Sequence, residues 1–265
     1  MTQIAITIDV EWAHPEVLAY VVNELDTRGL RATFFCTHAG IDVGQHERAL
    51  HPNYRRQGNS LLRERPEILS VDCELALYEQ ITSATKAFCP EAIGLRSHHL
   101  FWETGLTAVS KRIGIRYTSN SFQPLIRDLK PTMIGRGLID LPIYYMDHWD
   151  LTDSATSLQV ADLRMDTAGL KVLDFHPNLI YINARSEAQY LESKQHYHEP
   201  EKLLRNRAYG RGIQTLFLEL LDLLAARPVK PVLLRETYES TFAITPHAGG
   251  GPNCDFTNSS ASSLV

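Results

Sequence analysis

The sequence predicts an α/β fold in which parallel strands and helices alternate and the sheet curls into a closed or nearly closed barrel. Short apolar runs alternate along the chain with stretches whose apolar residues recur at the helical period. This alternation implies parallel strands joined by right-handed crossovers. The length of 265 residues suits a single α/β barrel, and a hydrophobic content of 44% provides material for one continuous core.

The expected strands are short and rich in apolar, β-branched or aromatic residues. They cover residues 3–10, 30–38, a stretch ending at Leu50-His51, 93–96, 115–119, 138–145, 170–175 and 231–238. The expected helices show one apolar face each and cover residues 15–28, 74–88, 104–113 and 213–226. Gly29 fits the end of the first helix, because glycine readily ends helices.

The domain organisation is predicted as one barrel over residues 1–243. Residues 183–211 form a strongly polar insertion within it, which is read as a solvated helical segment or as a lid. Residues 244–265 are rich in Gly, Pro, Asn and Ser, and this composition predicts a disordered tail.

Composition excludes several classes of protein. The formal net charge of −5 argues against a nucleic-acid-binding protein, which needs a basic face to neutralise phosphates. The sequence has no apolar window long enough to span a membrane and no export signal after Met1. The four cysteines form no CxxC pair, which argues against a zinc knuckle or a redox motif. We therefore expect a cytoplasmic protein with reduced thiols, and the sequence leaves its oligomeric state open.

Ionisable residues follow five of the expected strands. Because the carboxyl ends of parallel strands form the mouth of an α/β barrel, these residues are expected to converge there. The segments are Asp9-Val10-Glu11-Trp12, His51-Pro52-Asn53, Arg96-Ser97-His98-His99, Asp147-His148-Trp149-Asp150 and Asp174-Phe175-His176-Pro177-Asn178.

Asp9 and Glu11 stand two positions apart at the end of the first strand. If both stay extended, their side chains share one side of the strand and can approach a common centre. Two close carboxylates repel unless a cation joins them, and His51 would add a nitrogen ligand typical of zinc and other divalent sites. The alternative is structural, with the carboxylates capping a loop and the histidine satisfied within one.

The order of these segments resembles the polysaccharide deacetylase superfamily (carbohydrate esterase family four, the NodB-homology domain). The first motif, a paired carboxylate after a strand, is similar to Thr7-Ile8-Asp9-Val10-Glu11, and Gly29-Leu30-Arg31-Ala32-Thr33-Phe34-Phe35 resembles the second strand of the family. The later motifs match in order at His51, Arg96, Asp147-His148-Trp149 and Leu173-Asp174-Phe175-His176. The resemblance implies a distorted (β/α)7–8 barrel of the polysaccharide deacetylase type that removes N-acetyl groups from glycans with a divalent metal.

The resemblance also implies roles for individual residues. Asp9 corresponds to the general base, and Arg96 to the residue that holds it ionised. Glu11 and His51 correspond to ligands of a divalent metal ion, zinc being the expected one. His176 corresponds to the general acid that protonates the departing amine, which is needed because an amine anion is a very poor leaving group.

Two departures from the family pattern bear on these roles. The second histidine of the metal motif falls at Arg55, and arginine cannot bind a metal because it stays protonated. Either His98 or His99 completes the ligand set, with His98 preferred, or the site is weakened or empty. The proline and glycine expected after Arg96 are also missing, so the wall of the substrate groove must differ.

Substrate contacts are expected from residues beside these motifs, namely Trp12, His14, Asn53, Asp147 and Trp149. Tryptophan rings suit the C–H faces of sugars, although burial in the core is the commoner role of a tryptophan. His14 either lines the mouth of the barrel or sits before Pro15 at the entry to the first helix.

The leading hypothesis is a metal-dependent hydrolase that removes an acetyl group from an N-acetylated sugar or sugar conjugate. Two alternatives stay open. The barrel is a carbohydrate-binding or assembly protein without catalysis, for which the Arg55 substitution is the main support, or it is a metal-independent amidohydrolase of a small C–N substrate.

Overall fold

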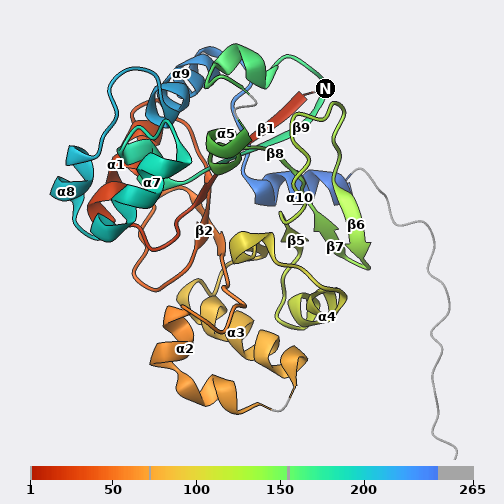
Figure 1. Cartoon of the computed structure of the whole chain (residues 1–265). Coiled ribbons are helices and arrows are strands. Elements are labelled where there is room, and N and C mark those ends of the chain that lie inside the picture. Colours follow the sequence, from red (N-terminus) through yellow and green to blue (C-terminus); the bar gives the residue numbers. More distant parts are fainter. Residues whose placement is uncertain (1, 72, 154–155, 244–265) are drawn as a thin grey trace, which may run out of the picture.

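A curled sheet forms the centre of the molecule, with helices on its outer side (Figure 1). The computed structural model describes residues 2–71, 73–153 and 156–243. Within them the sheet has nine strands, all parallel except β6, in the spatial order β6 (Thr132–Gly135), β7 (Leu138–Asp140), β5 (Tyr117–Thr118), β4 (Gly94–Leu95), β3 (Glu47–Leu50), β2 (Thr33–Cys36), β1 (Thr2–Asp9), β9 (Gly169–Phe175) and β8 (Ile143–Met146). The predicted tail, residues 244–265, lies outside the described residues.

The sheet curls because one stretch of chain joins its two sides. β7 pairs with β5, whereas β8, which follows almost directly, pairs with β9. The predicted strand over residues 138–145 is therefore interrupted at Leu141-Pro142, where proline has no N–H to donate to a strand partner. This change of neighbour brings β5 and β9 around toward each other, and the expected distorted α/β barrel is confirmed.

The helices follow the strands in the alternation that the apolar periodicity predicts. They are α1 (Pro15–Asp26), α2 (Ser60–Glu64), α3 (Glu74–Phe88), α4 (Thr104–Arg112), α5 (Asp147–Asp153), α6 (Pro177–Tyr181), α7 (Glu187–Ser193), α8 (Pro200–Arg205), α9 (Ile213–Ala226) and α10 (Leu234–Ala243). Short 3₁₀ helices cover Pro66–Ser70, His98–Leu100, Val160–Leu163 and Lys194–His196. No helix among the described residues has the length and apolarity that crossing a membrane requires.

Alternate residues of β1 face two different cores. Ile4, Ile6 and Ile8 belong to the large core between the sheet and its outer helices. Ala5 belongs to a smaller cluster inside the barrel, together with Phe35, Ala49, Tyr117, Ile139, Leu141, Leu170, Val172 and Leu234. Because side chains alternate along a strand, the inward series of β1 continues from Ala5 to Thr7 and Asp9, toward the carboxyl end of the barrel.

The last predicted strand, over residues 231–238, is wrong. Its second half begins helix α10, which closes the amino end of the barrel. The backbone N–H of Leu234 donates to Thr33 Oγ1 at 3.0 Å, and that of Arg235 donates to Glu47 Oε2 at 3.1 Å. The apolar run Pro231–Leu234 looked like a strand because it is buried, but its burial comes from plugging the barrel.

Candidate active site

The carboxyl ends of four strands bring the predicted site residues into one place. Asp9 ends β1, whereas His51, Arg96 and His176 directly follow β3, β4 and β9. Asp9, Glu11 and His176 each offer an atom within 4.8 Å of the others, and so do Glu11, His51 and His98. The six side chains therefore form one cluster, as the sequence predicts for the mouth of a barrel.

Glu11 reaches this cluster by a route different from the expected one. The strand ends at Asp9, and Glu11 has a φ of 52°, in the left-handed region that non-glycine residues seldom adopt. Its carbonyl oxygen accepts a hydrogen bond from Thr37 Oγ1, which helps to hold this turn. The premise that Asp9 and Glu11 both stay extended is wrong, although their carboxylates still converge. Such backbone strain is commonly found at functional sites.

Two imidazoles flank the Glu11 carboxylate. Glu11 Oε1 lies 3.3 Å from His51 Nε2 and 3.0 Å from His98 Nδ1. Burial alone would raise the pKa of Glu11, but the hydrogen bonds and charges of His51 and His98 hold it well below its usual value. Arg55 lies in the exposed loop after β3, where its N–H donates to Asn53 Oδ1, so it stands apart from this cluster.

Arg96 is fully buried and joins two carboxylates. Its Nη1 lies 2.8 Å from Asp9 Oδ1 and also contacts Asp174 Oδ1, and the guanidinium stacks 4.2 Å from the centre of the Phe35 ring. Nε and Nη2 donate to the backbone oxygen and the hydroxyl of Ser119. The arginine is thereby locked, and Asp9 faces the site with one oxygen held by a positive charge.

Asp174 is a second buried carboxylate that the sequence analysis did not single out as a site residue. Burial raises the pKa of Asp174 to about 7, with the attraction of Arg96 opposing this shift and the repulsion of Asp9 adding to it. Its Oδ2 has no hydrogen-bond partner among the described residues. The alternation of side chains along a strand could have indicated Asp174 as a site residue, because it lies two positions before His176 and so shares its side of β9.

His176 is oriented by Asp147, which is fully buried at the start of α5. His176 Nδ1 lies 2.6 Å from Asp147 Oδ1, and the backbone N–H of His176 donates to Asp147 Oδ2 at 2.8 Å. Burial would lower the pKa of His176, but the attraction and hydrogen bond of Asp147, together with Asp174 and Asp9, raise it to about 10. The imidazole is therefore protonated at neutral pH, with Nε2 left to face the site.

A cavity of about 670 Å³ opens above this cluster, a volume suited to a small ligand. Asp9, Glu11, His98 and His176 line its floor. Its walls come from four places: the loop and helix after β3, the turn after β4, the end of β8 with the start of α5, and the polar insertion. They include Gly58, Ser60, Arg63, His99, Leu100, Met146, His148, Tyr190, Lys194, Tyr197 and His198.

The predicted substrate residues lie in different places. Trp12 lines the cavity and packs edge-on against His98, with ring centres 5.2 Å apart. His14 caps helix α1, since its Nδ1 accepts a hydrogen bond from the N–H of Glu16, and it also lines a neighbouring cavity of about 280 Å³ together with Trp12. Trp149 packs against Phe122, and Asp147 is buried behind His176. His14, Asn53, Asp147 and Trp149 are not among the described residues that line the larger cavity.

The polar insertion, for which a solvated helical segment and a lid were both possible, contributes a wall of the cavity. Tyr190 packs edge-on against His148, whose ring centre lies 6.2 Å from that of His176. Lys194 Nζ lies 4.7 Å from the centre of the Tyr190 ring. The signal was available in Tyr190 and Tyr197, because aromatic residues in an otherwise polar stretch indicate a buried contact.

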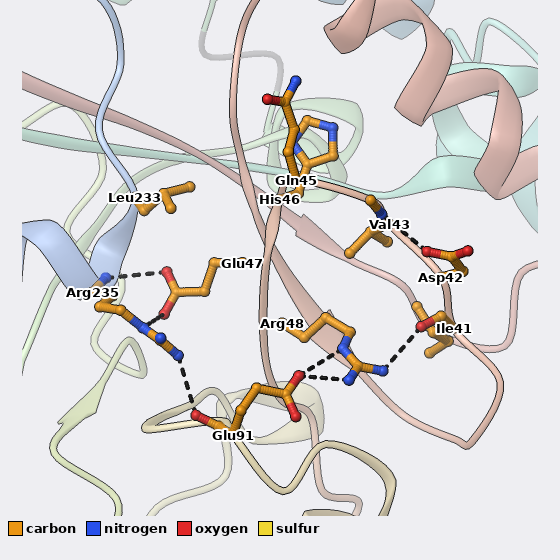
Figure 2. Close-up of a pocket in the computed structure, with 11 residues that line it drawn as sticks. Ile41, Asp42, Val43, Gln45, His46, Glu47, Arg48, Glu91, Leu233 and Arg235 are labelled. Carbon is orange, nitrogen blue, oxygen red and sulfur yellow. Dashed lines mark hydrogen bonds and ion pairs between the residues drawn. The ribbon is translucent and has the colours of Figure 1, made fainter.

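A separate cavity, of about 490 Å³, lies beside the amino ends of β2 and β3, far along these strands from the cluster. Figure 2 shows Glu47 pointing toward Arg235 and Glu91 toward Arg48, and both contacts are ion pairs. Glu47 also accepts hydrogen bonds from Thr33 and Tyr117. These ion pairs engage Glu47, Glu91 and their arginines within this cavity, whereas the predicted site residues converge on the first cavity, which is therefore the candidate site.

A family model described as WbmS-like polysaccharide deacetylase matches residues 6–194. The chain belongs to this family. The match includes Asp9, Glu11, His51, Arg96 and His176, and the predicted membership in the NodB-homology superfamily is confirmed. No curated protein matches the chain.

Two solved structures are similar to this family member. A candidate polysaccharide deacetylase of Bordetella bronchiseptica, described as involved in O-antigen biosynthesis, is 25% identical with a TM-score of 0.71, over 83% of this chain and 90% of the other. A candidate polysaccharide deacetylase of Mycobacterium smegmatis is 17% identical with a TM-score of 0.54, over 95% of this chain and 94% of the other. The second likeness supports the fold alone.

Proposed function

We propose that this protein is a metal-dependent deacetylase that hydrolyses the acetamido group of an N-acetylated sugar. The observation that carries the proposal is the arrangement of the cluster. Glu11, His51 and His98 offer three atoms within 4.8 Å of one another, next to Asp9 on Arg96 and beside His176 on Asp147. Membership of a polysaccharide deacetylase family supports the same reaction.

Glu11, His51 and His98 fit a divalent metal ion, and zinc in particular. One carboxylate and two imidazoles make up a ligand set that catalytic zinc sites use, with a further position open for water or substrate. Asp9, Glu11 and His176 form an overlapping group, but in this proposal His176, which Asp147 holds at Nδ1, keeps its Nε2 for the substrate. His98 therefore takes the place that Arg55 cannot fill.

When bound, such an ion polarises the acyl oxygen and lowers the pKa of a water molecule. Asp9 is the base that accepts the proton of the attacking water, and it lines the cavity floor beside Glu11. Arg96 pairs with Asp9 Oδ1 and holds this carboxylate toward the cavity, because its own contacts to Ser119 and Phe35 prevent the guanidinium from moving.

His176 supplies the acid on the other side of the cluster. Asp147 holds Nδ1, so the proton on Nε2 is the one available for transfer to the leaving nitrogen. The amine leaves in neutral form and the acetyl group becomes acetate. His176 returns to the protonated state readily because Asp147, Asp174 and Asp9 favour its positive charge.

The proposed substrate is an N-acetylated sugar within a polysaccharide or its precursor. Support comes from the family and from the relative described as involved in O-antigen biosynthesis. A cytoplasmic location stays a prediction.

Acetate release tests the proposal. The protein is treated with a chelator, reloaded with zinc and incubated with N-acetylglucosamine oligomers and with UDP-N-acetylglucosamine. We expect acetate from at least one of these after zinc loading, a loss of most activity after chelation, and at least a hundredfold lower kcat for Asp9→Asn.

Arg65→Gln is a matched control, since Arg65 is exposed and pairs with Glu67 outside the cavity. Full activity of Asp9→Asn, or of the chelated protein, would overturn the assignment and favour a metal-independent amidohydrolase. Absence of acetate with every substrate would favour a binding protein.

A further inference from the structure

The walls of the site cavity carry two cations that have no carboxylate partner. Arg63 of α2 and Lys194, which follows α7, both line the cavity, and neither forms an ion pair within residues 2–71, 73–153 and 156–243. The described carboxylates that line the cavity are Asp9 and Glu11. These are already engaged on its floor, by Arg96 and by the histidines respectively.

Some cations of the same segments do have carboxylate partners. Arg65 pairs with Glu67 at 2.5 Å, and Lys202 pairs with Glu199 at 2.5 Å, both outside the cavity. Arg211 of the insertion likewise pairs with Glu219. The chain as a whole is acidic, with a formal net charge of −5. Other cations of these segments, such as Arg56 and Arg205, also form no ion pair among the described residues, so what distinguishes Arg63 and Lys194 is that both line the cavity.

Local structure positions the two chain segments that carry these exposed cations. Arg63 stands on α2, where Asn59 Oδ1 caps the helix by accepting from the N–H of Leu62. Lys194 lies over the ring of Tyr190, which in turn packs against His148 beside His176. The two charges thus come from separate segments of the chain and face the same space.

We infer that the substrate of this site carries an anionic group near its acetamido group, and that Arg63 and Lys194 bind that anion. The inference rests on the proposed function for the acetamido part. A carboxylate on the sugar and a phosphate attached to it share the chemistry that an arginine and a lysine recognise. A volume of about 670 Å³ holds a sugar ring together with such a group.

Binding of three matched sugars tests the inference without requiring turnover. The probes are N-acetylglucosamine, N-acetylglucosaminuronic acid and N-acetylglucosamine 1-phosphate, with dissociation constants measured by ligand-observed NMR on the zinc-loaded protein. We expect at least one anionic probe to bind about tenfold more tightly than the neutral sugar at low salt. The advantage should shrink at about 0.5 M salt, because exposed charges are screened there.

Single substitutions test whether Arg63 and Lys194 cause the preference for an anionic sugar. Arg63→Gln and Lys194→Gln should each weaken binding of the preferred anionic probe about fivefold more than binding of the neutral sugar. Arg65→Gln and Lys202→Gln remove the same charge from ion pairs outside the cavity and should leave the ratio between probes unchanged. The better anionic probe distinguishes a sugar carboxylate from a sugar phosphate.

Equal affinity for the neutral and both anionic probes would overturn the inference, and so would a preference that survives in the Arg63→Gln, Lys194→Gln double variant. These outcomes are separate from failure of the proposed function. Selective binding of an anionic probe with no acetate released from any probe would contradict the deacetylase activity alone. Acetate release with no anion preference would contradict the inference alone.

Discussion

Glu11 Oε1 lies 3.0 Å from His98 Nδ1, although the two residues are 87 positions apart in the chain. The contact supplies a second imidazole to a carboxylate that already faces His51. We propose that His98, which follows the next strand, takes the role of the metal-binding histidine that the family pattern places at Arg55.

Removal of the His98 imidazole tests this substitution. His98→Ala should weaken zinc binding by at least about a hundredfold, because it removes one of three proposed ligands. The measurement is a competition titration of zinc against a chromogenic chelator. His99→Ala is the control, since His99 lines the cavity but is outside the Glu11 group, and it should change zinc affinity little. Equal losses in the two variants would contradict the assignment of His98.

Replacement of Arg96 tests how much the buried ion pairs contribute to the free energy of unfolding. Arg96→Met should lower the free energy of unfolding by about 3–5 kcal/mol, because it leaves Asp9 and Asp174 buried without their shared cation. Urea unfolding of the metal-free protein measures this. Adding Asp174→Asn to Arg96→Met should recover part of the loss when stability is measured well above pH 7, where the Asp174 carboxyl group, with a pKa of about 7 beside Arg96, ionises without a partner. No recovery in the double variant would show that the two carboxylates are not coupled through Arg96.

The pair of His176 and Asp147 predicts how stability depends on pH. The folded-state pKa of His176 is about 10, above the ordinary value of about 6.5 that applies to the unfolded chain. Its contribution is therefore fully present below about pH 6.5, declines above it, and is lost as the pH rises through about 10. In the metal-free protein, the stability difference between wild type and His176→Gln should shrink with rising pH. A difference that stays constant from about pH 6 to about pH 10 would argue against a protonated His176.

Helix α10 is predicted to act on stability and not on chemistry. Leu234 is fully buried inside the amino end of the barrel, together with Phe35 and Tyr117. Leu234→Ala should lower the free energy of unfolding by about 2–4 kcal/mol through the cavity that it leaves. Zinc affinity should match that of wild type when measured well below the unfolding midpoint. A large loss of zinc affinity in this variant would contradict the prediction that α10 contributes to stability alone.

The sequence predicts most of the fold where local signals agree with the tertiary structure. Helices α3 and α9 have the predicted bounds, because an amphipathic period over about four turns is a strong signal. The predicted strand over residues 231–238 is wrong because a short buried apolar run has the same sequence pattern in a strand as in a segment that fills the end of a barrel. The predicted strand over residues 138–145 is interrupted at Pro142 because β7 and β8, on either side of it, pair with different strands. The local sequence does not indicate such long-range pairing.

The part of the site that depends on strand ends can be predicted from the sequence. Asp9, His51, Arg96 and His176 follow strands, so the rule of the carboxyl ends places them together. The choice between His98 and His99 depends on the backbone after β4, where His99 has a φ of 57°. The approach of Tyr190 and Lys194 depends on how the polar insertion folds back over the barrel, which no strand pattern indicates.

The zinc content of the purified protein tests the central claim most directly. After removal of bound metal and titration with zinc, elemental analysis of the desalted protein should give one tightly bound equivalent for wild type. His51→Ala should retain almost none, while its circular dichroism spectrum stays that of wild type. A wild-type protein that retains no zinc, or a His51→Ala variant that retains one equivalent, would contradict the account.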